Sequence, residues 1–228
     1  MRFGLLLLIF VSAFHGAASA NTDALLTTAL DNFRPEGAKG WSFTQTTRGD
    51  GHSRVERYDA AQPDFNRWTL LREDNHAPTP DEIRDYQEKL SRRSRGGTAP
   101  RLTDQLDRAA VTVVSDDGER VVYRGKLKEG EAGDATARFL EATLTIHRPT
   151  ATLEKFEIAS TGPFSPVFGV KIAEMKTTMQ YSLPADERPS LLLNSTTRLR
   201  GRAFYFKSLD ADMTVTFTDH QPVRRPKK

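Results

Sequence analysis

The sequence predicts a mainly β protein (α+β), built on a single strongly curved antiparallel sheet of about eleven strands with two helices. Apolar and polar residues alternate in short runs along most of the chain, which is the period of half-buried strands. Short turn signals separate the runs, the clearest being Asp117-Gly118 between two β-branched segments. An antiparallel sheet of this length has to curl or close in order to bury its apolar face.

The first twenty residues predict a secretory signal peptide. Arg2 precedes an apolar core at 5–14, and the segment ends in Ala18-Ser19-Ala20, an A-x-A cleavage pattern. The apolar core is too short to span a membrane. Removing 20 of the 228 residues leaves 208, and we expect residues 21–228 to form one exported, soluble domain.

The composition narrows the chemistry. The chain has no cysteine, which excludes thiol redox chemistry and cysteine-ligated zinc, so the exported domain needs a hydrophobic core rather than disulfides. Its net charge of +3 becomes +2 without Arg2, which is mild. The basic tail RRPKK at 224–228 is read either as a solubilising end or as a contact for anionic lipid or nucleic acid. We expect no nucleic-acid partner for an exported protein.

Two helices are predicted. The segment 22–33 carries Leu25, Leu26, Leu30 and Phe33 on one broad apolar stripe. The second helix starts at the sequence TPDE, an N-cap threonine followed by a proline and a glutamate at the first and third helical positions.

The second helix has a narrow apolar stripe, formed by Ile83, Tyr86 and Leu90, and Gly96-Gly97 ends it. We therefore expect it to lie on the surface. The predicted strands occupy 41–47, 53–59, 66–72, the hairpin 111–127, 139–147, 151–160, 170–183, 191–200, 203–207 and 212–218.

Motifs for catalysis are absent. The sequence has no G-x-S-x-G, no H-E-x-x-H and no phosphate-binding glycine loop. The histidines that follow the predicted cleavage site are far apart in sequence: His52, His76, His147 and His220. A non-local pairing of His52 with Asp50, or of His147 with Glu141, stays open. Asp50 with Asp59, and Asp116 with Asp117, are placed at turns, where aspartate is expected for backbone reasons. We predict no catalytic residue, no metal ligand and no cofactor.

Three arginines share one strand parity: Arg198, Arg200 and Arg202. Phe204 and Phe206 continue that parity if no bulge intervenes. Such a face would bind an anionic lipid headgroup or a phosphate. Otherwise it is a solvated arginine ladder in which Gly201 marks a bulge.

A strongly curved sheet beneath thin helices tends to enclose an apolar cavity, which is the predicted ligand site. The residues predicted to line it are Trp41, Phe43, Trp68, Leu70, Met175, Met179 and Tyr181. The loop STGPFSPVFGVKI adds Phe164 and Phe168 at one rim. These two rings either plug the end of the core or form a gate over the cavity mouth.

The order of elements resembles the LolA/LolB-like superfamily of periplasmic lipoprotein carriers, which includes lipid-sensing envelope regulators. The stretches that carry the resemblance are RVERYDAAQPDFNRWTLL leading into TPDEI, then IHRPTATLEKFEI, and finally FYFKSLDADMTVTFTDHQPV. The resemblance covers the whole exported chain. It implies an incomplete barrel with helices as a lid and an interior that accepts acyl chains. It also implies an arginine that holds the lid closed, for which Arg54, Arg57 and Arg67 are all candidates.

The predicted function is that of a non-enzymatic, monomeric carrier or chaperone in the periplasm, which binds a lipid, an acyl chain or a lipoprotein. Peripheral contact with a membrane is compatible with this role. One alternative is an envelope regulatory or interaction protein of the same fold, with a protein partner and no cargo. A third is a hydrolase with a non-local site.

Overall fold

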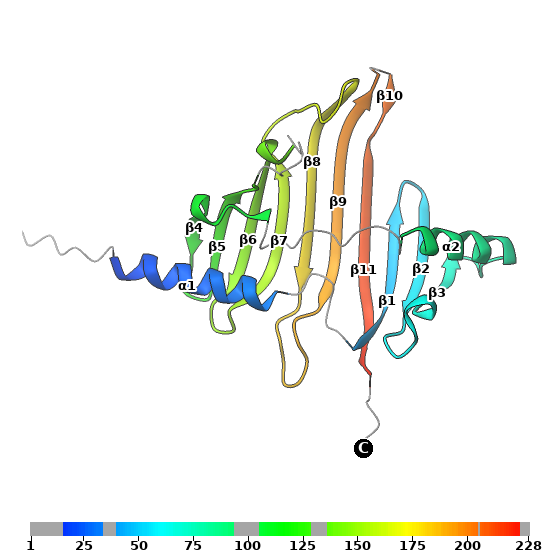
Figure 1. Ribbon diagram of the computed structural model, residues 1–228, viewed down its shortest axis with the longest axis horizontal. Coiled ribbons are helices and arrows are strands. Elements are labelled where there is room, and N and C mark those ends of the chain that lie inside the picture. Colours follow the sequence, from blue (N-terminus) through cyan, green and yellow to red (C-terminus); the bar gives the residue numbers. More distant parts are fainter. Residues whose placement is uncertain (1–15, 34–39, 94–104, 129–135, 205, 224–228) are drawn as a thin grey trace, which may run out of the picture.

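The computed structural model describes residues 16–33, 40–93, 105–128, 136–204 and 206–223, with side chains from residue 24 onward (Figure 1). Several predicted features lie outside the described residues. They are residues 1–15 of the predicted signal peptide, the glycine pair predicted to end the second helix, and the basic tail 224–228.

The described chain forms one antiparallel sheet of eleven strands and two α-helices, which confirms the mainly β prediction. The helices are α1 (Gly16–Asn32) and α2 (Pro80–Arg93). The strands are β1 (Trp41–Gly49), β2 (His52–Tyr58), β3 (Trp68–Glu73), β4 (Thr112–Asp116), β5 (Arg120–Lys126), β6 (Leu140–His147), β7 (Thr152–Ser160), β8 (Val170–Tyr181), β9 (Leu192–Ala203), β10 (Lys207–Ser208) and β11 (Ala211–Pro222).

The strand order is β3-β2-β1-β11-β9-β8-β7-β6-β5-β4, with β10 paired to β9. From β4 to β11 the chain is the meander that short turns favour. The first three strands instead join the sheet through the pairing of β1 with β11, the last strand. The two edges, β3 and β4, do not pair with each other, so the sheet is open.

Both helices lie on the same face of the sheet (Figure 1). Directly opposed residues in an antiparallel pair project from the same face. One row of such pairs runs from the core beside α1 to Arg54, whose guanidinium carbon lies 5.8 Å from the ring centroid of Tyr86 in α2. The row is Phe156, Met179, Ser195, Val215, Thr47 and Arg54. We call this the helix-bearing face.

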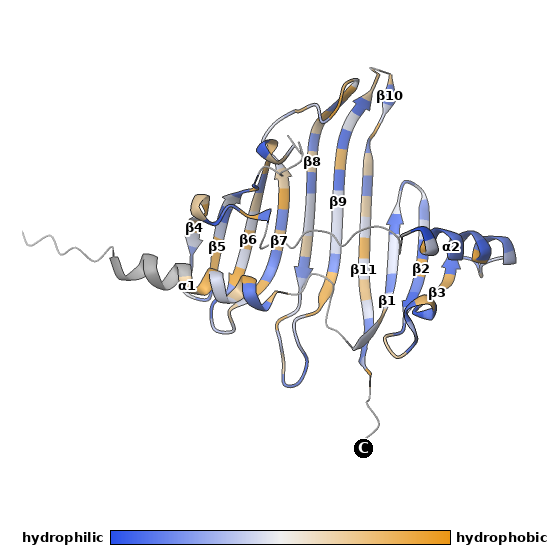
Figure 2. Ribbon diagram, in the orientation of Figure 1, coloured by the Kyte–Doolittle hydropathy of each residue, from blue (hydrophilic) through white to orange (hydrophobic). Residues whose placement is uncertain are grey.

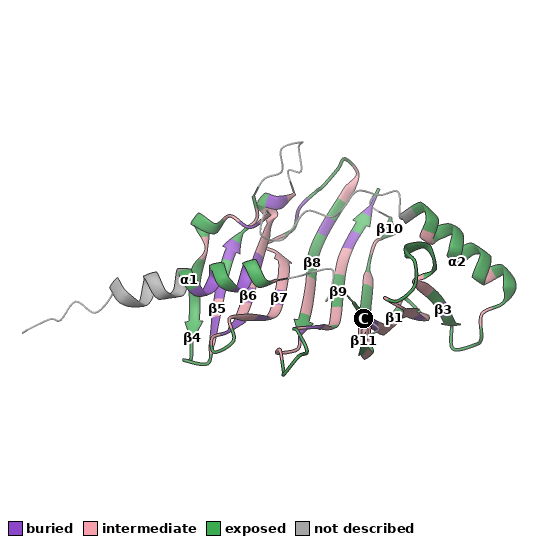
Figure 3. Cartoon of the chain, turned by 60° about the horizontal axis from the view of Figure 1, so that its bottom comes forward, coloured by how far each residue is buried: buried purple, intermediate pink, exposed green. Residues whose placement is uncertain are grey.

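The main core lies under α1. Leu25, Leu26 and Leu30 of the predicted stripe are buried against β5, β6 and β7, where Tyr123 and Leu144 are almost fully enclosed. Figure 3 shows the buried residues gathered on β5 and β6 beside this helix. The helix begins at Gly16 rather than near residue 22, because the small residues preceding the stripe continue the helix.

The second helix is a surface helix, as predicted. Thr79 and Glu82 form the capping box: the Glu82 carboxylate accepts hydrogen bonds from the Thr79 backbone N–H at 2.7 Å and from its hydroxyl at 2.9 Å. Tyr86 is buried, whereas Ile83 is 39% exposed. Figure 3 shows α2 as almost entirely exposed, so this end of the sheet is covered far more thinly than the α1 end.

One strand prediction is wrong. The segment 203–207 is not a strand: Phe204 and Phe206 lie in the turn between β9 and the two-residue β10. Phe204 has a φ of +48°, a left-handed conformation that ends the strand and breaks the parity predicted from Arg198 to Phe206. The bulge expected at Gly201 lies on the partner strand instead, between Ile172 and Glu174 of β8.

Candidate functional site

The middle of the helix-bearing face is the candidate site, because no described helix lies over the centre of β8, β9 and β11 (Figure 1). Polar and apolar residues alternate along β11 (Figure 2), so one of its faces is apolar. We define the central strip as the side chains that these three strands place on the helix-bearing face: Met175, Thr177, Met179, Ser195, Thr197, Leu199, Met213, Val215 and Phe217.

Every side chain of the central strip is at least partly exposed, and Met213 is 42% exposed. The strip is six apolar side chains interrupted by three hydroxyls. The Thr177 and Thr197 hydroxyl oxygens lie 3.2 Å apart and bond each other across the strands. Along β8 the strip runs about 13 Å, and across the three strands about 10 Å, from the usual strand spacings.

The opposite face of the same strands is polar and charged. Lys176 of β8 pairs with Glu157 at 2.9 Å, and Arg200 of β9 pairs with Asp212 of β11 at 2.5 Å. The Arg200 hydrogen bond holds the pKa of Asp212 below its ordinary value, so the carboxylate stays charged. The sheet is therefore amphipathic in its centre, and its apolar face is the one over which no described helix lies.

An aromatic cluster borders the strip at the β1 end. The Phe43 ring lies 5.0 Å from Tyr58, 5.7 Å from Trp68 and 5.5 Å from Phe217. His220 completes the cluster at 6.1 Å from Phe43. Burial lowers the pKa of His220, although a hydrogen bond with the Leu192 backbone acts in the opposite direction. The lowered pKa favours the neutral form of the ring.

The residues predicted to line the cavity lie in different parts of the structure. Met175 and Met179 lie in the central strip, and Phe43 and Trp68 lie in the aromatic cluster beside it. Leu70 and Tyr181 are packed inside, with Tyr181 edge-to-face against Phe33 at 5.2 Å. Trp41 is half-buried at the start of β1, opposite Pro222.

The two rim phenylalanines do not act together. Phe164 is buried, stacks on Phe139 at 5.3 Å and forms a β-bridge with Ile172, which is the position of a plug. Phe168 is 98% exposed and covers nothing. This placement supports the plug alternative for Phe164 alone and does not fit a paired gate, because Phe168 is exposed to solvent.

Leu199 was not among the predicted site residues, and neither were Met213, Val215 and Phe217. The alternation of the last three was visible in the sequence. What placed them beside Met175 and Met179 is the pairing of β11 with β9, and of β9 with β8. No residue pattern signals that β11 would lie in the middle of the sheet.

Of the three arginine candidates, Arg54 is the one that touches a helix. Its guanidinium donates to both carboxylate oxygens of Glu73, at 2.6 and 2.7 Å, and lies over Tyr86. Arg57 bonds the Thr44 hydroxyl and the Asp219 backbone carbonyl, and Arg67 bonds Asp64 and the Gln62 carbonyl. Arg54 is thus placed to hold α2 against β2 and β3.

The histidine and carboxylate pairings differ from those weighed in the sequence. His52 contacts Asp74 at 3.2 Å rather than Asp50, and His147 bonds Thr150 at 2.8 Å rather than Glu141. Backbone N–H groups lower the pKa of Asp117, which marks it as an ionised turn residue. Within the described ranges, no group of three or more histidine, aspartate or glutamate side chains is arranged to hold a metal ion.

Comparisons with known proteins assign no family. No family model matches the chain, and no curated protein matches it. Among solved structures, it is similar to an isomerase-inactive variant of GphF DH1, at 11% identity over 90% of this chain and 82% of that chain, with a TM-score of 0.19. That score supports neither a shared fold nor a shared activity. None of the described helices is long and apolar enough to cross a membrane.

Proposed function

We propose that this protein is a non-enzymatic, exported binding protein for an acyl chain, and that the acyl chain lies on the central strip between the two helices. The observation that carries the proposal is the amphipathic centre of the sheet. An antiparallel sheet normally buries its apolar face. Here α1 buries one end of the sheet and α2 covers the other end thinly, while Met179, Leu199 and Met213 stay partly exposed between the helices.

The chemistry of the strip favours an aliphatic ligand over a peptide. The strands β8, β9 and β11 are paired on both sides, so they offer no free backbone edge to an added strand. The Thr177 and Thr197 hydroxyls already bond each other. Apart from the Ser195 hydroxyl, what remains is apolar contact, and methionine side chains adapt readily to a flexible apolar partner. The periplasmic carrier role and the lid role of α2 belong to this proposal, with Arg54 as the residue that fastens the helix.

The test compares two neighbouring residues of β11 that face opposite ways. Met213→Asp places a carboxylate on the strip, whereas Thr214→Asp places one on the polar face. Because Met213 is 42% exposed, we expect the folded protein to tolerate the charge. We expect Met213→Asp to weaken binding of a fluorescent fatty acid about tenfold or more, since an unpaired carboxylate would lie against the chain. Thr214→Asp should bind as the unmodified protein does.

Equal binding of the fatty acid by both variants would show that the ligand does not lie on the central strip. If the unmodified protein takes up no fluorescent fatty acid and carries no lipid in native mass spectrometry, the proposal is wrong.

The alternative, an envelope interaction protein, has one observation in its favour. The edge strand β4 is exposed along its whole length, and Val113 and Val114 are 47% and 48% exposed. An edge of this kind can pair with a strand of another protein. Crosslinking in cells from position 113 would trap such a partner, and adding Val114→Lys would abolish the crosslink. The hydrolase alternative stays a prediction: His52 contacts Asp74 at 3.2 Å and His76 lies 3.7 Å from Glu82, but the two histidine side chains are 79% and 52% exposed.

A further inference from the structure

The far end of β8 and β9 carries an exposed apolar patch that the proposed function does not use. We define the aromatic tip as Val167, Phe168, Phe204 and Phe206, which are 62%, 98%, 59% and 86% exposed. Among the described large apolar residues, Phe65 is the one other that exceeds 50% exposure. Contiguous exposed apolar groups on a folded protein mark an interaction site.

The members of the aromatic tip come from two turns that lie side by side. The loop ending at Gly169 leads into β8, and the turn containing Phe204 follows β9. Val170 and Ala203, at those strand ends, pair directly. The Phe204 backbone N–H donates to the Gly169 carbonyl at 2.6 Å. Figure 1 shows both turns at the same end of the sheet.

The exposure of Phe168 is built into the loop. Phe164 anchors the loop, since it exchanges two backbone hydrogen bonds with Ile172 at 2.8 and 2.9 Å. Gly169 has a φ of +79°, and a Cβ there would lie 2.8 Å from the Phe204 ring. The glycine therefore lets the Phe204 ring pack against the loop backbone, and this fixed turn leaves Phe168 pointing into solvent.

Three cations adjoin the aromatic tip on β8, β9 and β10. Lys171 and Arg202 are directly opposed on β8 and β9, and Lys207 follows the turn on β10; all three are exposed. Like charges placed opposite each other destabilise a sheet, so folding does not favour this pair. In the part of the chain that the structure describes, none of the three forms an ion pair with a carboxylate.

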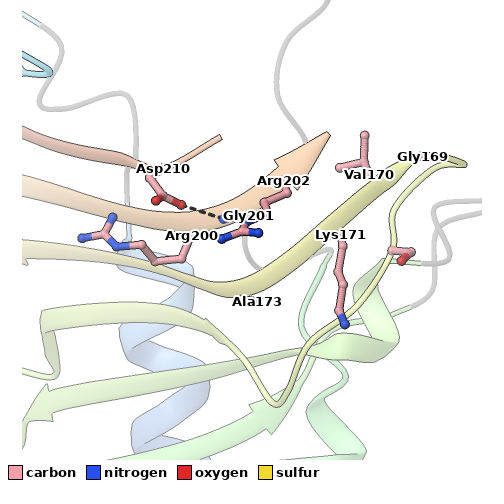
Figure 4. Close-up of a pocket in the computed structure, with 9 residues that line it drawn as sticks. Gly169, Val170, Lys171, Ala173, Arg200, Gly201, Arg202 and Asp210 are labelled. Carbon is pink, nitrogen blue, oxygen red and sulfur yellow. Dashed lines mark hydrogen bonds between the residues drawn. The ribbon is translucent and has the colours of Figure 1, made fainter. Parts of the chain in front are cut away.

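A hollow of about 630 Å³ opens beside the tip, lined in part by Gly169, Lys171, Arg200 and Arg202 (Figure 4). The one carboxylate lining it, Asp210, accepts a hydrogen bond from the Gly201 backbone N–H at 3.0 Å. Arg200 is paired with Asp212, which leaves Lys171 and Arg202 as the cations of the hollow available to an anionic group.

We propose that the aromatic tip inserts into the surface of a bilayer that contains anionic lipid, with Lys171, Arg202 and Lys207 against the headgroup phosphates. Aromatic rings are favoured at the boundary between headgroups and acyl chains. Each nearby cation adds attraction to an anionic leaflet. An apolar patch ringed by cations without carboxylate partners matches this surface better than it matches an uncharged protein.

The experiment is vesicle flotation with the protein as isolated after export, using phosphatidylcholine vesicles with and without phosphatidylglycerol. We expect binding to the anionic vesicles, weakened by added salt. For the double variant F168S/F206S, the fraction of protein bound to anionic vesicles should be about tenfold or more below that of the unmodified protein, because two apolar rings no longer insert. The double variant K171S/R202S should lose the preference for phosphatidylglycerol.

The matched control is Phe65→Ser, which removes an 82% exposed ring from the segment between β2 and β3 and should float as the unmodified protein does. In a Phe168→Trp variant, tryptophan emission should shift to the blue when anionic vesicles are added. The proposal is overturned if F168S/F206S floats normally. It is also overturned if the unmodified protein binds no vesicle, or if the tip mediates self-association that F168S/F206S abolishes. Fatty-acid binding by F168S/F206S should be unchanged. The membrane proposal and the acyl-chain proposal can therefore be contradicted independently of each other.

Discussion

At the scale of single residues, the surroundings of each side chain decide its chemistry here. Phe164 and Phe168 are the same residue type in the same loop, yet one is 7% and the other 98% exposed. The difference comes from the backbone hydrogen bonds that hold Phe164 against β8 and from the left-handed Gly169 that follows Phe168. Residue identity alone therefore did not assign a role to either ring.

The environment of His220 predicts how the stability of the protein depends on pH. Burial lowers its pKa in the folded chain below the ordinary imidazole value of about 6.5. At a pH between the folded and unfolded pKa values of this imidazole, the unfolded chain binds more protons than the folded chain. The neutral ring therefore contributes its full share to the free energy of unfolding above about pH 6.5. That contribution is lost as the pH falls through the lower, folded pKa. Arg57 and Arg188 add to the lowering, and Asp219 opposes it.

The test is His220→Gln, which keeps a donor for the Leu192 carbonyl but does not titrate. We expect the free energy of unfolding of the variant to fall less steeply with acid than that of the unmodified protein. Well above the imidazole pKa, the two should differ by a constant amount. Parallel curves across the acidic range would contradict a lowered pKa.

At the scale of elements, α2 depends on its cap more than on its packing. The helix buries one aromatic ring, Tyr86, and its remaining apolar stripe is partly exposed. Helices with so little tertiary contact rely on end effects for stability. The Thr79–Glu82 capping box and the contact of Tyr86 with Arg54 are what fix this helix.

We therefore expect Thr79→Ala to destabilise α2 by about 1 kcal/mol, the usual loss for an N-cap side chain. Amide hydrogen exchange along residues 83–93 would measure it locally. Thr79→Ser, which retains the hydroxyl, should restore protection. If Thr79→Ala leaves exchange along the helix unchanged, the capping box is not what holds it.

At the scale of the whole molecule, the two ends of the sheet are unequal. The α1 end contains the large core cluster, including Leu30, Tyr123 and Leu144. At the α2 end, β2 buries Glu56 and β3 buries Leu70, and the other side chains of these strands are at least partly exposed. Stability within one structure follows the density of buried apolar contact.

Native-state hydrogen exchange with added denaturant should show this asymmetry. Amides of β2, β3 and α2 should open with a smaller free energy than those of β5 and β6. Leu30→Ala should lower the opening free energy of β5 and β6 by about 2–5 kcal/mol and leave the opening of β2 and β3 unchanged. One common opening free energy for all strands would show that the sheet unfolds as a single unit.

The local elements of this protein followed from its sequence. Strand alternation, the Asp117-Gly118 turn, the capping box at Thr79 and the leucine stripe of α1 are set by interactions between residues close in the chain. Such interactions leave a readable period or motif. The misread segment at 203–207 is an exception, because five residues rich in aromatics read as a strand whether or not the backbone turns there.

Tertiary structure alone decided the strand order, and with it the candidate site. The pairing of β1 and β9 with β11 brings Met213, Val215 and Phe217 between Met175 and the aromatic cluster. Pairing between strands far apart in the chain depends on which apolar faces can be buried together, and alternation records only that a face exists. The sequence therefore determined an amphipathic sheet with two helices, and the three-dimensional packing decided which part of its apolar face the described helices leave uncovered.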